Sequence, residues 1–233
     1  VPVYVGMRNW HPLLEETVSQ MHRDGVERAV VQILSVFQSQ SSWNDYQNAL
    51  AKAVNRIKPQ ISFSYADPPY DQPGFYHTMT ENISRCLAGL EDARRPGAHI
   101  LFAAHSLPLS DPDVKRYVRQ IQWTAEQVSR ELAHPNWHIV YQSRSGRPQD
   151  PWLTPDINET LRELAAGGVS DVVAAPIGFV CDNIEVLYDL DTQARQTANR
   201  AGIGFSRART VENDPRFIDA LADLVTRAAT TET

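Results

Sequence analysis

Residues 100–108 read Ile100-Leu101-Phe102-Ala103-Ala104-His105-Ser106-Leu107-Pro108, an apolar run followed by an imidazole and a turn. An apolar run of this length predicts a short strand. His105 then lies at the carboxyl end of that strand, and Pro108 sets the turn that follows. A lone histidine is more often structural, but a histidine in the loop that follows a strand is a candidate for function.

Apolar or β-branched runs alternate with amphipathic helical patterns on both sides of this strand. Further strands are expected at 3–5, 29–34, 61–65, 137–141, 172–175 and 204–206, and helices at 13–21, 43–57, 75–90, 114–132, 184–201 and 217–228. Thr154 is expected to cap one more helix, with Pro155 at its first position. The alternation predicts an α/β fold with parallel sheets and helices on both faces, in which ligands bind outside the carboxyl ends of the strands.

Composition and cysteine usage exclude several classes of protein. Of the 233 residues, 42% are hydrophobic and 21% are charged, and the formal net charge is −6. Because lysines and arginines are scattered along the chain, we expect neither nucleic acid nor an anionic membrane as the main partner. Cys86 and Cys181 lie outside any CxxC pattern, which argues against a disulfide framework and against a structural zinc or iron–sulfur site.

The pattern of hydrophobicity predicts a cytoplasmic protein without a transmembrane segment. No apolar run approaches the roughly 20 residues needed to cross a bilayer, and no signal-peptide pattern is present. The first five residues, Val1 to Val5, already have the pattern of a strand. We therefore expect that the chain begins inside a fold and that a segment upstream is missing.

Three carboxylates follow the strand expected at 172–175. Asp182, Glu185 and Asp189 have the spacing i, i+3 and i+7, which places them on one helix face. A solvated acidic helix start would explain them, since the helix dipole favours negative charge there. The apolar residues around them favour a site for a cation or a proton instead. His105 opposed by carboxylates suits a transiently bound divalent ion such as Fe²⁺, Co²⁺ or Zn²⁺.

Other catalytic templates find no support, because the sequence contains no GxSxG, GxGxxG, Walker A or HExxH motif. A series of short motifs, in order along nearly the whole chain, resembles instead the ferrochelatase family. These are Gly6-Met7-Arg8-Asn9-Trp10-His11-Pro12, His105-Ser106-Leu107-Pro108, Tyr141-Gln142-Ser143-Arg144, Pro151-Trp152-Leu153, Pro176-Ile177-Gly178-Phe179-Val180, Ile184-Glu185-Val186-Leu187-Tyr188-Asp189-Leu190-Asp191 and Asn213-Asp214-Pro215-Arg216-Phe217-Ile218.

The resemblance implies a fold and a reaction. The fold is two similar doubly wound, Rossmann-like lobes with the active-site cleft between them, the first lobe from residues 1–66 plus 208–233 and the second from 67–207. The reaction is the insertion of ferrous iron into protoporphyrin IX or coproporphyrin III in haem biosynthesis, by a lyase-class metal chelatase. Fe²⁺ is then a substrate, and no permanent cofactor is expected.

The resemblance also implies roles for individual residues. His105 and Glu185 face each other across the porphyrin, where His105 accepts a pyrrole proton or binds iron. From their position more than from a motif, Asp182 and Asp189 are expected to join them as metal-binding residues along the route by which protons or metal move. The expected porphyrin contacts are Arg8 to a propionate, Trp152 on the macrocycle, Ser39 and Tyr188. The alternatives are a surface salt bridge for Arg8 and a core position for Trp152.

Departures from the family pattern leave other functions open. Asn183 stands where the family commonly has histidine, Gln193 stands where a glutamate usually continues the acidic ridge, and the family's N-terminal section has no counterpart before Val1. The alternatives are a non-catalytic tetrapyrrole-binding protein and a cobalt chelatase of related fold. A peripheral membrane contact that delivers an apolar product is a further expectation.

Overall fold

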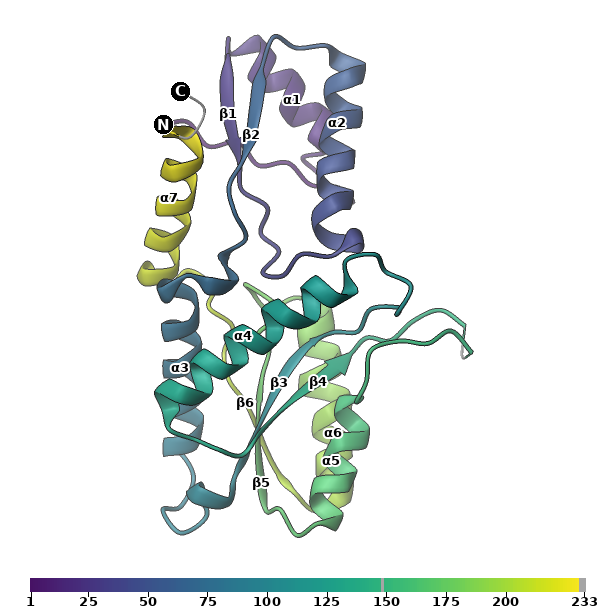
Figure 1. Ribbon diagram of the computed structural model, residues 1–233, viewed down its shortest axis with the longest axis vertical. Coiled ribbons are helices and arrows are strands. Elements are labelled where there is room, and N and C mark those ends of the chain that lie inside the picture. The colour runs from purple at the N-terminus through teal and green to yellow at the C-terminus, as the bar shows by residue number, and fades with distance from the viewer. Residues whose placement is uncertain (148, 231–233) are drawn as a thin grey trace.

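The larger sheet contains the apolar strand that ends at His105. The structure is a computed structural model that describes residues 1–147 and 149–230. Four described strands lie in the order β4-β3-β5-β6, with every neighbouring pair parallel: β3 (His99–His105), β4 (Trp137–Gln142), β5 (Asp171–Ala175) and β6 (Gly204–Arg207) (Figure 1). The chain moves from β3 to β4 in one direction and then crosses back to β5 on the other side of β3. The topological switch point therefore lies between β3 and β5, which is where doubly wound sheets bind ligands.

Helices cover both faces of this sheet because alternate residues of β3 point to opposite sides. Ile100, Phe102 and Ala104 are buried against α3 (Pro73–Ala88) and α4 (Val114–Leu132). Leu101 and Ala103 are buried against α5 (Ile157–Ala166), a π-helical segment (Val186–Ala194) and α6 (Arg195–Ala201). Figure 1 shows the two helix layers on either side of the sheet. The predicted α/β fold with a doubly wound parallel sheet is confirmed.

The smaller sheet pairs β1 (Arg28–Val31) with β2 (Ser62–Tyr65) in parallel. On one side of it α1 (Leu14–Arg23) and α2 (Asp45–Ile57) bury Val18, Leu50 and Ala53, and α7 (Pro215–Thr230) lies along the other side (Figure 1). The α7 helix contacts β1 and β2 as well as α3. The predicted lobes, 1–66 plus 208–233 and 67–207, stay a prediction.

Two local expectations were wrong. Residues 3–5 do not form a strand: they pair with no strand among the described residues, and the side chains of Val3 and Val5 are exposed. The cap of α5 is Asp156 rather than Thr154, since its carboxylate accepts the Asn158 N–H at 2.8 Å. Pro155 precedes the helix because its carbonyl oxygen accepts the N–H of Tyr141, which keeps this segment extended beside β4.

Among the described residues, none of the helices combines the length and the apolar character needed to cross a bilayer.

Candidate active site

His105 and Glu185 meet at the switch point of the larger sheet. His105 is the last residue of β3, and Glu185 is the second residue of the helical segment that follows β5. Nε2 of His105 lies 3.6 Å from Oε1 of Glu185, with about a third or more of each side chain exposed. The pair is thus close enough to attract, and open enough to contact a substrate.

The tautomer of His105 follows from its second nitrogen. Nδ1 lies 2.5 Å from the carbonyl oxygen of Ser106, and a carbonyl oxygen can only accept, so Nδ1 carries a hydrogen. In the neutral ring the lone pair is therefore on Nε2, the nitrogen that faces Glu185. The Tyr117 hydroxyl donates to the backbone oxygen of His105 at 2.9 Å and holds the strand end in place.

Each member of the pair shifts the pKa of the other. Burial by itself lowers the pKa of His105, but Glu185, the Ser106 carbonyl and Asp189 together outweigh burial and raise it above 6.5. The pKa of Glu185 lies below 4.5, because its interaction with His105 outweighs the effect of burial. His105 therefore accepts a proton more readily than an ordinary histidine does, and Glu185 remains ionised beside it.

Glu185 stands at the start of a π-helical segment. The helix begins at Ile184, and Val186–Ala194 are π-helical before α6 continues. Asn183 caps this helix, since its side-chain oxygen accepts the Val186 N–H at 3.0 Å. Such π-helical insertions are frequent at functional sites.

The cap at Asn183 corrects the expectation that three carboxylates share one helix face. Asp182 precedes the helix and turns away to Arg207 on β6, whose guanidinium it meets with both carboxylate oxygens at 3.0 and 2.9 Å. Glu185 and Asp189 stay on the helical segment. Within residues 1–147 and 149–230, no three His, Cys, Asp or Glu side chains converge closely enough to hold a metal ion. The metal-binding roles of His105, Glu185, Asp182 and Asp189 stay predictions.

Two residues at the end of β4 hold Glu185 and Asp189 in place. The buried amide of Gln142 donates to the backbone oxygen of Glu185 at 3.2 Å and to Asp189 at 3.4 Å, and the Ser143 hydroxyl also donates to Asp189. In the sequence this dipeptide is part of a family motif, and no role was predicted for it. Its position directly after a strand next to β3 was the available signal. A pocket of about 280 Å³ lies here, and Gln142, Ser143, Asp189, Tyr188 and Gln193 are among the residues that line it.

The residues predicted to contact a porphyrin lie in different surroundings. Arg8 pairs with Asp45 at 3.2 Å and lies over the ring of Tyr46, as the salt-bridge alternative anticipated. Ser39 is buried, and its hydroxyl caps the turn at the Ser42 N–H. Tyr188 is half exposed beside Asp189.

Trp152 lies near the turn that follows His105. It pairs with Pro108 in an antiparallel bridge, and its indole nitrogen is buried without a hydrogen-bond partner among the described residues. The neighbouring Leu153 carbonyl accepts the Ser106 hydroxyl at 3.0 Å. The structure thus brings Trp152 to the His105 turn, while the substrate roles of Arg8, Trp152, Ser39 and Tyr188 stay predictions.

Comparison with solved structures shows the fold. The chain is similar to SirB from Bacillus subtilis with Fe³⁺, with a TM-score of 0.67, 15% identity and coverage of 95% of this chain and 79% of that chain. It is also similar to the sirohydrochlorin chelatase SirB from Bacillus subtilis subspecies spizizenii in complex with cobalt, with a TM-score of 0.66, 17% identity and coverage of 100% and 83%. The fold is therefore that of the chelatases.

Comparison of sequences shows the family. The coproporphyrin III ferrochelatase of Streptomyces coelicolor is 41% identical over 98% of this chain and 66% of its own length. The coproporphyrin III ferrochelatase of Frankia alni is 40% identical over 97% of this chain and 61% of its own length. The ferrochelatase of Thermus thermophilus is 38% identical over 97% of this chain and 71% of its own length. This chain thus spans about two thirds of the length of these relatives. The family model described as Ferrochelatase matches residues 1–229, and the chain belongs to the ferrochelatase family.

Proposed function

We propose that this chain carries the catalytic side chains of an enzyme that inserts ferrous iron into a porphyrin in haem biosynthesis. The observation that carries the proposal is the pairing of His105 with Glu185 at the switch point of the larger sheet, 3.6 Å apart and partly exposed. Membership of the ferrochelatase family supports it. Two of the relatives are named coproporphyrin III ferrochelatases, so coproporphyrin III is the first substrate to test, with protoporphyrin IX beside it.

Insertion of Fe²⁺ requires that two pyrrole N–H protons leave the macrocycle. Nε2 of neutral His105 has the lone pair to accept one of them, and Glu185 then stabilises the imidazolium that forms. The raised pKa of His105 makes the ring a better proton acceptor, provided that the pH is high enough to leave it neutral. Gln142 and Ser143 hold Asp189 next to this pair, where its charge adds to the stabilisation.

The remaining roles complete the proposal. Glu185, Asp189 and Asp182 are the acidic side chains proposed to guide Fe²⁺ or protons, and His105 can ligate the incoming metal as an alternative to taking a proton. Arg8, Ser39, Trp152 and Tyr188 are proposed to contact the porphyrin in a cleft between the two lobes. Asp182 would have to leave Arg207 before it could bind a cation.

Anaerobic Fe²⁺ insertion, followed by porphyrin absorbance, tests the proposal with the unmodified chain, His105→Ala and a control variant. His22→Ala is the control because His22 is exposed at the end of α1. We expect His105→Ala to lose at least ~100-fold in insertion rate, the scale of general acid–base catalysis, while its affinity for the porphyrin stays within about twofold. His22→Ala should insert iron at the unmodified rate.

Other outcomes would favour other functions. Insertion by His105→Ala at the unmodified rate would sink the assignment. Porphyrin binding without insertion by any variant would favour the tetrapyrrole-binding alternative, and faster insertion of Co²⁺ than of Fe²⁺ would favour a cobalt chelatase.

A further inference from the structure

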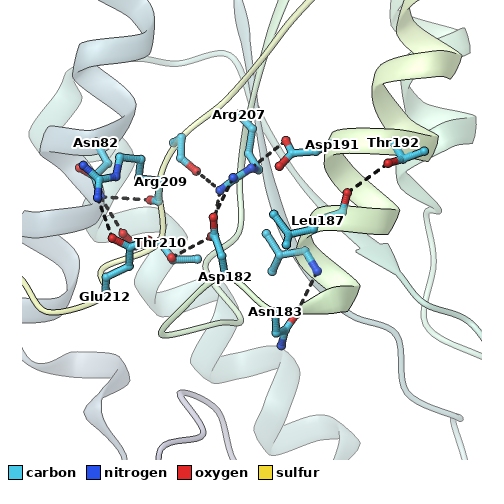
Figure 2. Close-up of polar contacts among 12 residues, drawn as sticks. Asn82, Asp182, Asn183, Leu187, Asp191, Thr192, Arg207, Arg209, Thr210 and Glu212 are labelled. Atoms are coloured by element: carbon cyan, nitrogen blue, oxygen red, sulfur yellow. Dashed lines mark hydrogen bonds and ion pairs between the residues drawn. The ribbon is translucent and has the colours of Figure 1, made fainter.

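Arg207 joins three segments of the chain behind the candidate active site. It is the last residue of β6, and its side chain is only 12% exposed. Two of its guanidinium nitrogens donate to the two oxygens of Asp182, and Nε donates to Asp191 at 2.9 Å. Figure 2 shows Arg207 between these two carboxylates. One planar guanidinium thus binds one carboxylate in a fork and a second from its side.

The two carboxylates flank Glu185 in the sequence. Asp182 lies in the loop three residues before Glu185, and Asp191 lies six residues after it within the π-helical segment. Arg207 therefore ties both ends of the segment that carries Glu185 to the edge of the larger sheet. Few sequences adopt a π-helix, because this conformation is rarely favoured by the local sequence alone. Contacts with residues outside the helix therefore have to define its position.

Neighbouring groups hold the two carboxylates in turn. The buried hydroxyl of Thr210 donates to Asp182 at 3.0 Å, and Arg195 approaches Asp191 at 3.4 Å (Figure 2 shows Thr210). The two negative charges of Asp182 and Asp191 thus face the positive charges of Arg207 and Arg195. Among the described residues, the other side-chain partner that Asp182 has is the neutral hydroxyl of Thr210, so without Arg207 the loop before Glu185 would lose its charged anchor.

We propose that Arg207 is a positioning residue that holds Glu185 against His105 by anchoring Asp182 and Asp191 on either side of it. The catalytic role of Glu185 in this proposal rests on the function proposed above. The contact between Glu185 and His105, however, is present in the chain without substrate. In the part of the chain that the structure describes, the hydrogen bonds of Arg207 go to Asp182, Asp191 and the Ala208 backbone rather than to His105 or Glu185, so Arg207 acts through the backbone between its two anchors. A purely structural ion pair would affect unfolding and leave the site of the folded protein unchanged.

The test compares Arg207→Met with Glu185→Gln, using the NMR signals of the His105 ring at fixed pH in the folded chain. If Arg207 acts through Glu185, Arg207→Met moves the His105 signals toward their position in Glu185→Gln. The double variant then coincides with Glu185→Gln, because the contact is already lost. Arg209→Met is the matched control, since Arg209 lies two residues away and pairs with Glu212 on the surface.

The kinetics of iron insertion provide a second test of the role of Arg207. We expect kcat to fall ~10- to ~100-fold in Arg207→Met, the range in which a misplaced catalytic group costs rate, with KM for the porphyrin unchanged. If Arg207→Met does not fold, Asp191→Asn cuts one anchor and Arg207→Lys keeps the charge without the fork. Both should shift the His105 signals in the same direction by a smaller amount.

The outcomes separate the two proposals. Unchanged His105 signals in folded Arg207→Met, or a shift that adds fully to that of Glu185→Gln, would overturn the positioning role. Absence of iron insertion by the unmodified chain would contradict the proposed function, while the NMR comparison would still decide the role of Arg207.

Discussion

Replacing Glu185 with glutamine should lower the pKa of His105, because it removes a negative charge that raises this pKa in the folded chain. The substitution keeps the shape of the side chain and removes its charge 3.6 Å from Nε2. Coulomb attraction at that distance is about 1 kcal/mol in water and about 5 kcal/mol at an effective dielectric constant of about 20. Because a third or more of each side chain is exposed, the attraction between Glu185 and protonated His105 lies near the lower limit, at ~1–2 kcal/mol.

The assay is an NMR titration of the histidine rings, with His105 assigned from the signal that disappears in His105→Ala. Glu212→Gln serves as the control, because Glu212 pairs with Arg209 away from His105. We expect the midpoint of His105 to fall in Glu185→Gln and to stay unchanged in Glu212→Gln. If both variants titrate like the unmodified chain, Glu185 is not the group that raises the pKa of His105.

The same pair predicts how stability depends on pH. The pKa of Glu185 is lowered by folding, so its contribution is present above its ordinary value of 4.5 and is lost as the pH falls through the folded value. The pKa of His105 is raised, so its contribution is present below 6.5 and is lost as the pH rises through the folded value. Glu185→Gln should therefore destabilise most between about pH 4.5 and 6.5, measured by urea unfolding.

Two substitutions test the packing that carries the site. A Cβ on Gly74 would lie 2.0 Å from the backbone oxygen of Arg216, so Gly74→Ala should separate α3 from α7 and cost ~3 kcal/mol of unfolding free energy. Gly97→Ala is the control: it has open space around it and should cost under ~1 kcal/mol. Equal urea midpoints for these two variants would contradict the close approach of the helices. Asp156→Ala removes the acceptor for the Asn158 N–H and should cost ~1 kcal/mol, and an unchanged midpoint would show that the cap does not stabilise α5.

Patterns of a few residues were sufficient for much of the fold. The apolar run before His105 is buried as β3, and the helix expected at 114–132 is α4, because period and propensity act over neighbouring residues. The expectation failed at residues 3–5, where the strand pattern is present but none of the described strands pairs with it. It failed at Thr154 because Pro155 pairs with Tyr141, a residue on another element.

Some residues of the candidate site were likewise predictable from the sequence, and others were not. Position after a strand made His105 and the three carboxylates candidates, and the resemblance to the family singled out Glu185 as the partner of His105. A parallel sheet brings the carboxyl ends of its strands to one edge, where the two side chains meet. Gln142 was overlooked as a residue that holds the site, since its partners lie more than 40 residues away.

Asp182 shows what the local sequence pattern predicts and what only the tertiary structure decides. Along the chain it belongs with Glu185 and Asp189, and helical spacing alone would place all three carboxylates on one face. In the folded protein it binds Arg207, 25 residues further on, because the alignment of β6 beside β5 brings a guanidinium within reach. Spacing along the sequence describes which side chains a single helix presents, whereas the partner of a charge depends on which elements pack together, and that is defined only when the sheet has formed.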